Sequence, residues 1–279
     1  MEQTMTFYNG NTMPQVGLGV FRVPNDDSCQ LAVQHAIESG YRSIDTAMIY
    51  GNEEKVGEGI AAGLAKTGLS REDLFITSKL WLDDYGRTQV EDAYQTSLDK
   101  LGLTYLDLYL MHWPGLDYAV MVDTWKGMET LYHQGRVSNI GVSNFNVTHL
   151  EKLLIETSIK QVINQVECHP YLTQKALKAY LDAQHIAMAS WSPLMNGQIL
   201  YDQTVREIAS SLERSPAQII VRWNVQHGIV TIPKSTTPSR IEENIHVFDF
   251  ELSGTQMAKL DELDRGQRIG PDPLVFNGK

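Results

Sequence analysis

An aspartate and a tyrosine stand five residues apart in the segment "SIDTAMIYGNE", residues 43–53. The segment begins as a short apolar strand that ends at Asp45, and a helix is predicted from Asn52 onward. Two later strand-like segments also end in side chains that carry protons, "DLFITSKL" with Lys79 and "LDLYLMH" with His112. Each residue alone would fit a solvated loop or a structural hydrogen bond better than a catalytic role, so their combination carries the argument.

Together with Tyr50, these residues could deliver a proton to a substrate oxygen. A phenol, with a pKa near about 10, is a poor acid at neutral pH. The ammonium group of Lys79 would lower the pKa of Tyr50, and the carboxylate of Asp45 would keep the lysine charged. His112 could hydrogen-bond and orient the same substrate oxygen. The set therefore predicts general acid catalysis on an oxygen that becomes negative when its carbon is attacked.

These side chains can meet only if the ends of their strands meet. After an N-terminal hairpin, eight strand-like segments each precede a helical segment, beginning with "QVGLGVF". The strands are short continuous apolar runs, as expected where both faces of a parallel sheet are covered. Eight such units in 279 residues predict an α/β fold, the (β/α)8 TIM barrel, as one domain over residues 1–279. The hairpin would close its bottom, and the loops at its carboxyl-terminal face would be short.

An open doubly wound sheet is the alternative fold. Such sheets usually carry a G-x-G-x-x-G pattern after the first strand. The segment "GLGVFRVP" at residues 17–24 lacks the third glycine and the following helix, which favours the barrel.

Two helix starts carry explicit signals. Thr88 and Glu91 have the spacing of a capping box. Ser215 is predicted to be an N-cap, with Pro216 at the first helical position and Gln218 at the third.

Composition excludes several classes of function. The net charge of −11 and the pI near 5.2 argue against binding to nucleic acid or to an anionic membrane. Cys29 and Cys168 are far apart and fit free thiols in a reducing compartment, and no metal-binding cluster is visible. Without an export signal or a long apolar run, the sequence predicts a cytoplasmic protein.

Seven segments resemble, in order and spacing, the signature segments of the aldo-keto reductase family: "DTAMIYGNE", "ITSKLW", "LYLMHWP", "GVSNF", "NQVECHP", "SWSPL" and "IPKSTTPSRIEEN". The likeness covers essentially the whole chain. It is strongest to bacterial members with short loops, which include glyoxal and methylglyoxal reductases and 2,5-diketo-D-gluconate reductases.

The resemblance implies a catalytic tetrad of Asp45, Tyr50, Lys79 and His112, with Tyr50 as the general acid. It also implies NADPH as the cofactor, with the nicotinamide carboxamide at Ser143, Asn144 and Gln165 and the ring against Trp191. The full set of cofactor-binding residues that it implies is Gly19, Val20, Asp45, Ser143, Asn144, Gln165, Trp191, Ser192, Leu194, Asn196, Lys234, Ser235, Arg240, Glu243 and Asn244.

The segment "IPKSTTPSRIEEN" also predicts an anion site by itself. It leaves the last strand and enters a helix with Pro238 near the first position, flanked by Lys234, Ser235 and Arg240. Free backbone amides and two cations at a helix start favour a phosphate group. Ordinary helix capping and surface charge are the alternative. In the family, this segment holds the 2′-phosphate of NADP.

The sequence therefore predicts an NADPH-dependent carbonyl reductase of small aldehydes, α-dicarbonyls such as methylglyoxal, and aryl ketones. Phe21, Trp81 and Trp113 would form the substrate pocket with Tyr50 and His112. A reductase of sugar acids, an NADP-binding redox sensor and a metal-dependent hydrolase remain as alternatives. A monomer is usual for the family. The tail departs from better-known members by having Leu274 and Val275 where polar residues are common.

Overall fold

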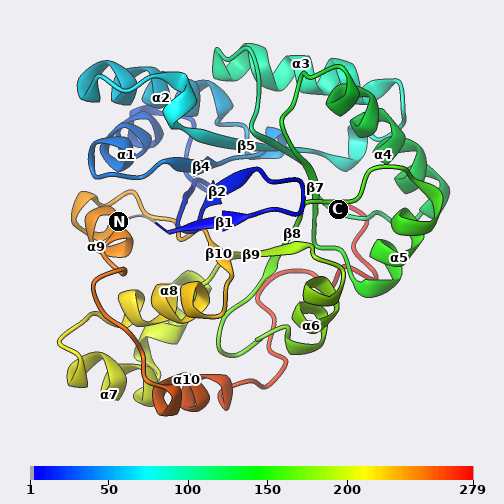
Figure 1. The fold of residues 1–279 in the computed structure, drawn as a ribbon. Coiled ribbons are helices and arrows are strands. Elements are labelled where there is room, and N and C mark those ends of the chain that lie inside the picture. The colour runs from blue at the N-terminus through cyan, green and yellow to red at the C-terminus, as the bar shows by residue number, and fades with distance from the viewer. Residues whose placement is uncertain (1–2, 279) are drawn as a thin grey trace.

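Eight parallel strands form the centre of the fold in the computed structural model, which describes residues 3–278 (Figure 1). Each strand pairs with the strands that precede and follow it in the chain, so the sheet order is the chain order. The strands are β3 (Leu18–Gly19), β4 (Ser43–Asp45), β5 (Phe75–Leu80), β6 (Leu108–Met111), β7 (Ile140–Ser143), β8 (Ile163–Glu167), β9 (Ala187–Trp191) and β10 (Val230–Thr231).

The first and last of these strands meet and close the sheet. Val16 bridges to Thr231 and Gly19 bridges to Lys234, both in parallel orientation. A Cβ atom on Gly19 would lie 3.0 Å from the carbonyl oxygen of Ile232, so this approach favours a residue without a side chain. The closed (β/α)8 barrel predicted from the sequence is therefore confirmed.

Helices surround the barrel as an outer ring (Figure 1). They are α1 (Asp27–Glu38), α2 (Glu53–Thr67), α3 (Gln89–Leu101), α4 (Tyr118–His133), α5 (Val147–Glu156), α6 (Lys175–Ala183), α7 (Gln203–Ser211), α8 (Pro216–Gln226), α9 (Pro238–Ile245) and α10 (Gly254–Asp261). Four short 3₁₀ segments are η1 (Met48–Tyr50), η2 (Arg71–Asp73), η3 (Leu82–Asp84) and η4 (Met195–Tyr201). Within residues 3–278, no helix is long and apolar enough to cross a membrane.

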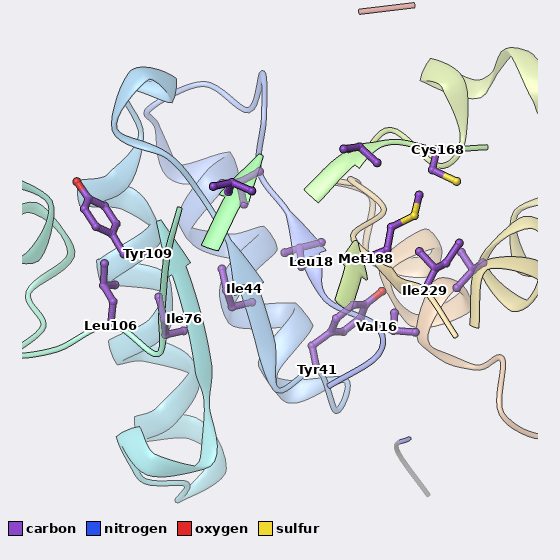
Figure 2. Packing of buried hydrophobic residues seen from close by; sticks show 14 of the residues in the cluster. Val16, Leu18, Tyr41, Ile44, Ile76, Leu106, Tyr109, Cys168, Met188 and Ile229 are labelled. Atoms are coloured by element: carbon purple, nitrogen blue, oxygen red, sulfur yellow. The ribbon is translucent and has the colours of Figure 1, made fainter. Parts of the chain in front are cut away.

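Buried apolar side chains fill the space between the strands and the helices. Figure 2 shows part of this cluster, including Leu18, Ile44 and Ile76 from three neighbouring strands. Tyr41 is fully buried in the cluster and donates its hydroxyl hydrogen to the carbonyl oxygen of Ile241 on α9, at 3.0 Å. This bond ties the last barrel helix to the start of β4.

The hairpin of β1 (Thr4–Thr6) and β2 (Thr12–Pro14) covers the amino-terminal end of the barrel. Its Phe7 packs edge-on against Phe75, the first residue of β5. Asn9 donates to the side chain of Asn139, which directly precedes β7, at 2.9 Å. The predicted position of the hairpin at the bottom of the barrel is confirmed, so the opposite, carboxyl-terminal end is the open one.

The two predicted helix starts had different outcomes. The hydroxyl oxygen of Ser215 accepts from the backbone amide of Gln218, and Pro216 is the first residue of α8, as predicted. The capping box at Thr88 is wrong. The backbone of Thr88 is already helical and its hydroxyl donates to Gln89, so it does not cap the amide three residues further on.

Candidate active site

Four side chains that could move a proton gather at the open end of the barrel. Asp45 is the last residue of β4, Lys79 lies in β5, and His112 directly follows β6. Tyr50 ends the short segment η1, which connects β4 to α2. Asp45, Lys79 and His112 are buried, and Tyr50 is partly buried. The structure thus brings together the four residues that the sequence singles out.

Lys79 is the centre of this group. Its ammonium nitrogen donates to Oδ1 of Asp45 at 2.5 Å and to the carbonyl oxygen of Thr46 at 2.8 Å. Its third contact is the phenol oxygen of Tyr50, at 3.3 Å. All three hydrogens of the ammonium group therefore have acceptors, and the side chain is fixed in position.

Burial and neighbouring charges together shift the pKa values of Lys79 and Tyr50. Burial disfavours the ammonium form of Lys79, but Asp45 and Tyr50 outweigh burial and raise the pKa of the lysine, which stays charged. Burial raises the pKa of Tyr50 above its ordinary value, and Lys79 only partly offsets that rise. Lys79 lowers the pKa of Tyr50, as the sequence predicts, but the unforeseen effect of burial is larger and the net shift is upward. Tyr50 holds its proton at neutral pH and can donate it.

His112 lies next to the phenol as a neutral imidazole. Its ring centroid is 5.6 Å from that of Tyr50 and 5.2 Å from that of Trp81. Burial, together with the charge of Lys79, holds the pKa of His112 well below its usual range. Its carbonyl oxygen accepts from the side-chain amide of Asn144 at 3.0 Å. A neutral histidine in this place can donate a hydrogen bond to a substrate oxygen without adding charge.

A cavity of about 410 Å³ lies against these residues. Its apolar and aromatic walls include Phe21, Trp81 and Trp113, which the sequence had suggested as pocket walls. The other lining residues are Gly19, Arg22, Asp45, Ile49, Tyr50, His112, Ser143, Asn144, Gln165, Trp191, Ser192, Asn196, Ile232, Lys234, Ile269, Gly270, Pro271 and Phe276. An apolar cavity with a few polar groups at one place is typical of sites for small molecules.

Polar side chains joined by hydrogen bonds line another part of this cavity. Gln165 donates to Oδ2 of Asp45 at 2.7 Å, so this group is joined to Asp45 and, through it, to Lys79. Ser143 donates to the carbonyl oxygen of Gln165 at 2.7 Å. The side-chain oxygen of Asn144 accepts from the indole of Trp191 at 2.8 Å. The residues that were expected to contact a nicotinamide all line the cavity: Ser143, Asn144, Gln165 and Trp191.

The remaining expected cofactor residues are only partly at the cavity. Those that line it are Gly19, Ser192, Asn196 and Lys234. The residues that do not line it are Val20, Leu194, Ser235, Arg240, Glu243 and Asn244. Arg240 is exposed in the first turn of α9, and Glu243 accepts a hydrogen bond from the hydroxyl of Ser215. Thr237, at the N-cap of α9, makes no side-chain cap bond.

The C-terminal tail adds lining residues that sequence reasoning missed. Ile269, Gly270 and Pro271 lie on the cavity, and Phe276 packs on Trp113 with ring centroids 4.3 Å apart. No periodic pattern in the tail marks these positions, although Phe276, the single aromatic residue in the sequence from 251 to 279, was a usable signal. Leu274 and Val275, which the sequence drew attention to, are exposed and do not line the cavity.

Comparison with known proteins identifies the family. The family model of the aldo/keto reductases matches residues 15–265. The chain belongs to the aldo-keto reductase family. This aldo-keto reductase is 50% identical over 278 residues to a glyoxal reductase of Bacillus subtilis, covering 99% of each chain. It is 46% identical over 278 residues to the methylglyoxal reductase DkgA of Yersinia pestis, covering 99% of this chain and 98% of the relative.

A solved structure gives the same result. An aldo-keto reductase of Bombyx mori, in complex with NADP, superposes with a TM-score of 0.91 at 38% identity, covering 97% of this chain and 95% of that one. The chain is therefore an oxidoreductase with the fold of this family.

The side chains of this aldo-keto reductase fit a nicotinamide dinucleotide. The amide oxygen of Gln165 makes none of the hydrogen bonds found among residues 3–278, whereas its nitrogen is held by Asp45. That oxygen can accept from a carboxamide. The indole of Trp191 offers a flat apolar surface on the same cavity, and the exposed cations Lys234 and Arg240 flank the start of α9. Such a helix start favours an anion.

A metal-dependent hydrolase would need a cluster of ligands. Across the described residues 3–278, no group of three or more His, Cys, Asp or Glu side chains is arranged to hold a metal ion.

Proposed function

We propose that this chain reduces aldehydes and ketones with NADPH, and that α-dicarbonyls such as methylglyoxal are among its substrates. The observation that supports this most directly is the contact of Lys79 with both Asp45 and Tyr50 beside an apolar cavity. This arrangement provides a protonated phenol, a fixed cation beside it and a neutral histidine within one small site. These three groups suit the protonation of a carbonyl oxygen on which negative charge develops.

Each residue has a distinct part in the proposed reaction. NADPH, when bound, would supply the hydride for the carbonyl carbon and would leave as NADP⁺. His112 and Tyr50 hold the carbonyl oxygen, and Tyr50 gives its proton to that oxygen as negative charge develops there. The ammonium of Lys79 then stabilises the phenolate that remains, and Asp45 keeps the ammonium charged. A proton from solvent restores Tyr50 for the next cycle.

The cofactor would be held at both of its ends. Ser143, Asn144 and Gln165 would take the carboxamide, and Trp191 would stack on the nicotinamide ring. At the other end, Lys234, Ser235 and Arg240 would take the 2′-phosphate, with support from the amides at the start of α9. An acidic protein can bind this anionic ligand where two of its cations, Lys234 and Arg240, flank the start of one helix.

The apolar walls of the cavity favour small carbonyl compounds with apolar or aromatic groups as substrates. Phe21, Trp81 and Trp113 provide flat apolar surfaces next to the proton donor. The relatives named for glyoxal and methylglyoxal reduction point to the same class of compound.

A reductase of sugar acids is the second candidate. Arg22 lines the cavity and is exposed, with its guanidinium 5.1 Å from the centroid of the Phe21 ring. A cation there could pair with the carboxylate of a keto-acid such as 2,5-diketo-D-gluconate.

The test is NADPH oxidation by the purified protein with methylglyoxal, with 2,5-diketo-D-gluconate, and with each substrate in the presence of a chelator. The proposal expects turnover with methylglyoxal that the chelator leaves unchanged. A higher kcat/KM for the sugar acid would favour the second candidate. No turnover with any carbonyl compound, despite tight NADPH binding, would leave a redox sensor as the better account. Activity lost to the chelator would contradict both reductase proposals.

A further inference from the structure

The carboxylate of Glu167 is fully buried and is not used by the proposed reaction. Glu167 is the last residue of β8, yet it does not line the cavity. Its Oε1 accepts from the backbone amide of Ile269 at 2.7 Å and from the ring of His169 at 2.9 Å. Its Oε2 accepts from the amide of Gly270 at 3.0 Å. One buried carboxylate thus fastens a tail segment that lies about a hundred residues later in the chain.

These hydrogen bonds favour the charged form of Glu167. Burial opposes ionisation, but the bonds from His169, Ile269 and Gly270 outweigh it and lower the pKa of the carboxyl group. The contact is therefore charge-assisted at neutral pH, and bonds of this kind are stronger than those between neutral groups.

The tail segment held by Glu167 packs closely against Trp191. Glu167 and Trp191 are register partners in β8 and β9, so the tail crosses the sheet beside the indole. A Cβ atom on Gly270 would lie 2.4 Å from Cη2 of Trp191 and 3.1 Å from Oε2 of Glu167. The backbone at this position therefore lies against the indole edge with no room for a methyl group. The indole itself is held from the other side by Asn144.

We propose that Glu167 is a positioning residue that sets the size selectivity of the site by holding Ile269 and Gly270 against Trp191. This inference rests on the proposed carbonyl reductase function. Ile269, Gly270 and the following Pro271 form a wall of the cavity, so a tail released from Glu167 widens it. A bulky group on the carbonyl carbon loses contacts with that wall. A small group that reaches only Tyr50 and His112 does not.

Two variants release the tail in different ways, and a third variant serves as the control. Glu167→Gln places an amide nitrogen opposite the amide of Gly270, so two donors face each other. Gly270→Ala inserts a methyl group between the tail and the indole, without a positive φ to strain the backbone. Gln174→Ala removes a bond to the backbone carbonyl of Glu167 and leaves the carboxylate contacts intact.

The substrate pair is methylglyoxal and phenylglyoxal, which share the dicarbonyl group and differ in the size of the substituent. Glu167→Gln and Gly270→Ala should raise the KM for phenylglyoxal by roughly tenfold, because the phenyl group loses apolar contacts with the tail. In Glu167→Gln, the KM for methylglyoxal, the kcat values and the Kd for NADPH should change less than about twofold. The double variant should add little to either single variant, because both act on the same contact.

Hydrogen exchange gives a readout that does not depend on activity. The amides of residues 269 and 270 should exchange faster in Glu167→Gln than in wild type or Gln174→Ala. Unchanged exchange in Glu167→Gln would overturn the inference. So would an equal loss of activity with both substrates together with a lower melting temperature, since that is the signature of a purely structural role. If wild type reduces neither substrate, the proposed function fails, while exchange at these two amides still tests the tail contact.

Discussion

The ammonium nitrogen of Lys79 lies 3.3 Å from the phenol oxygen of Tyr50. The lysine side chain is fully buried, so this charge acts on the phenol with little screening by solvent. Burial raises the pKa of Tyr50 and Lys79 lowers it, with burial the larger effect. In the proposed reaction, the lysine would therefore stabilise the phenolate that forms after proton transfer, while the phenol would remain protonated before it.

Lys79→Met is expected to remove most of the reductase activity. Without the cation, the phenolate of Tyr50 forms in a buried site with no opposite charge beside it, so its proton is harder to give up. The measurement is kcat with methylglyoxal at saturating NADPH, at a temperature where circular dichroism shows the variant to be folded. Near wild-type kcat would mean that Lys79 has only a structural part.

The same pair makes a prediction about stability. Removing one partner of a buried ion pair leaves the other charge uncompensated, so Lys79→Met should lower the free energy of unfolding by about 3–5 kcal/mol. Asp45→Asn combined with Lys79→Met removes both charges and should recover much of that loss. Urea unfolding of wild type, Lys79→Met, Asp45→Asn and the double variant measures this. Equal or additive losses in the double variant would contradict the coupling between the two residues.

The pH dependence follows from the raised pKa of Tyr50. Reduction needs the protonated phenol, so kcat for reduction should stay level from about pH 7 to about pH 9 and fall only when the phenol ionises. Oxidation of the corresponding alcohol needs the phenolate and should rise with pH instead. In Lys79→Met, the alkaline limb of the reduction profile should move to higher pH. A reduction rate that falls through neutral pH would argue against Tyr50 as the acid.

Arg240→Ala tests the preference for NADPH. Arg240 is exposed at the start of α9, where a 2′-phosphate would gain a charge-assisted contact of about 1.5–3 kcal/mol. The variant should weaken NADPH binding by roughly 10- to 100-fold and leave NADH binding almost unchanged. Fluorescence titration with both cofactors measures this, and Arg206→Ala, an exposed arginine of α7, is the matched control. Equal losses for the two cofactors would show that Arg240 supports the fold.

The sequence predicted that four side chains come together, because each lies at the end of a strand or shortly after one. Asp45, Lys79 and His112 each lie at the carboxyl end of an apolar strand, and parallel strands in a barrel bring such ends together. Tyr50 follows one of those strands within five residues. Local pattern and sheet geometry were therefore sufficient for these four residues to be placed side by side.

The contact between the tail and Glu167 could not be predicted from the sequence, and neither could the direction of the pKa shift at Tyr50. Glu167 and Gly270 are about a hundred residues apart, and neither lies in a periodic pattern that predicts their contact. The sign of the shift at Tyr50 depends on how deeply the phenol is buried, which residue types alone do not give. Thr88 failed as a cap for a similar reason, since its local backbone conformation decided the outcome.

The central claim is that Tyr50 donates the proton to the substrate, and Tyr50→Phe tests it most directly. The change removes one hydroxyl group and keeps the ring beside Phe21 and His112. The measurement is the single-turnover rate of NADPH oxidation with methylglyoxal, alongside the Kd for NADPH. We expect the rate to fall by at least about a hundredfold, the usual scale for a general acid, with the Kd little changed. A Tyr50→Phe variant that turns over at near the wild-type rate would contradict the account.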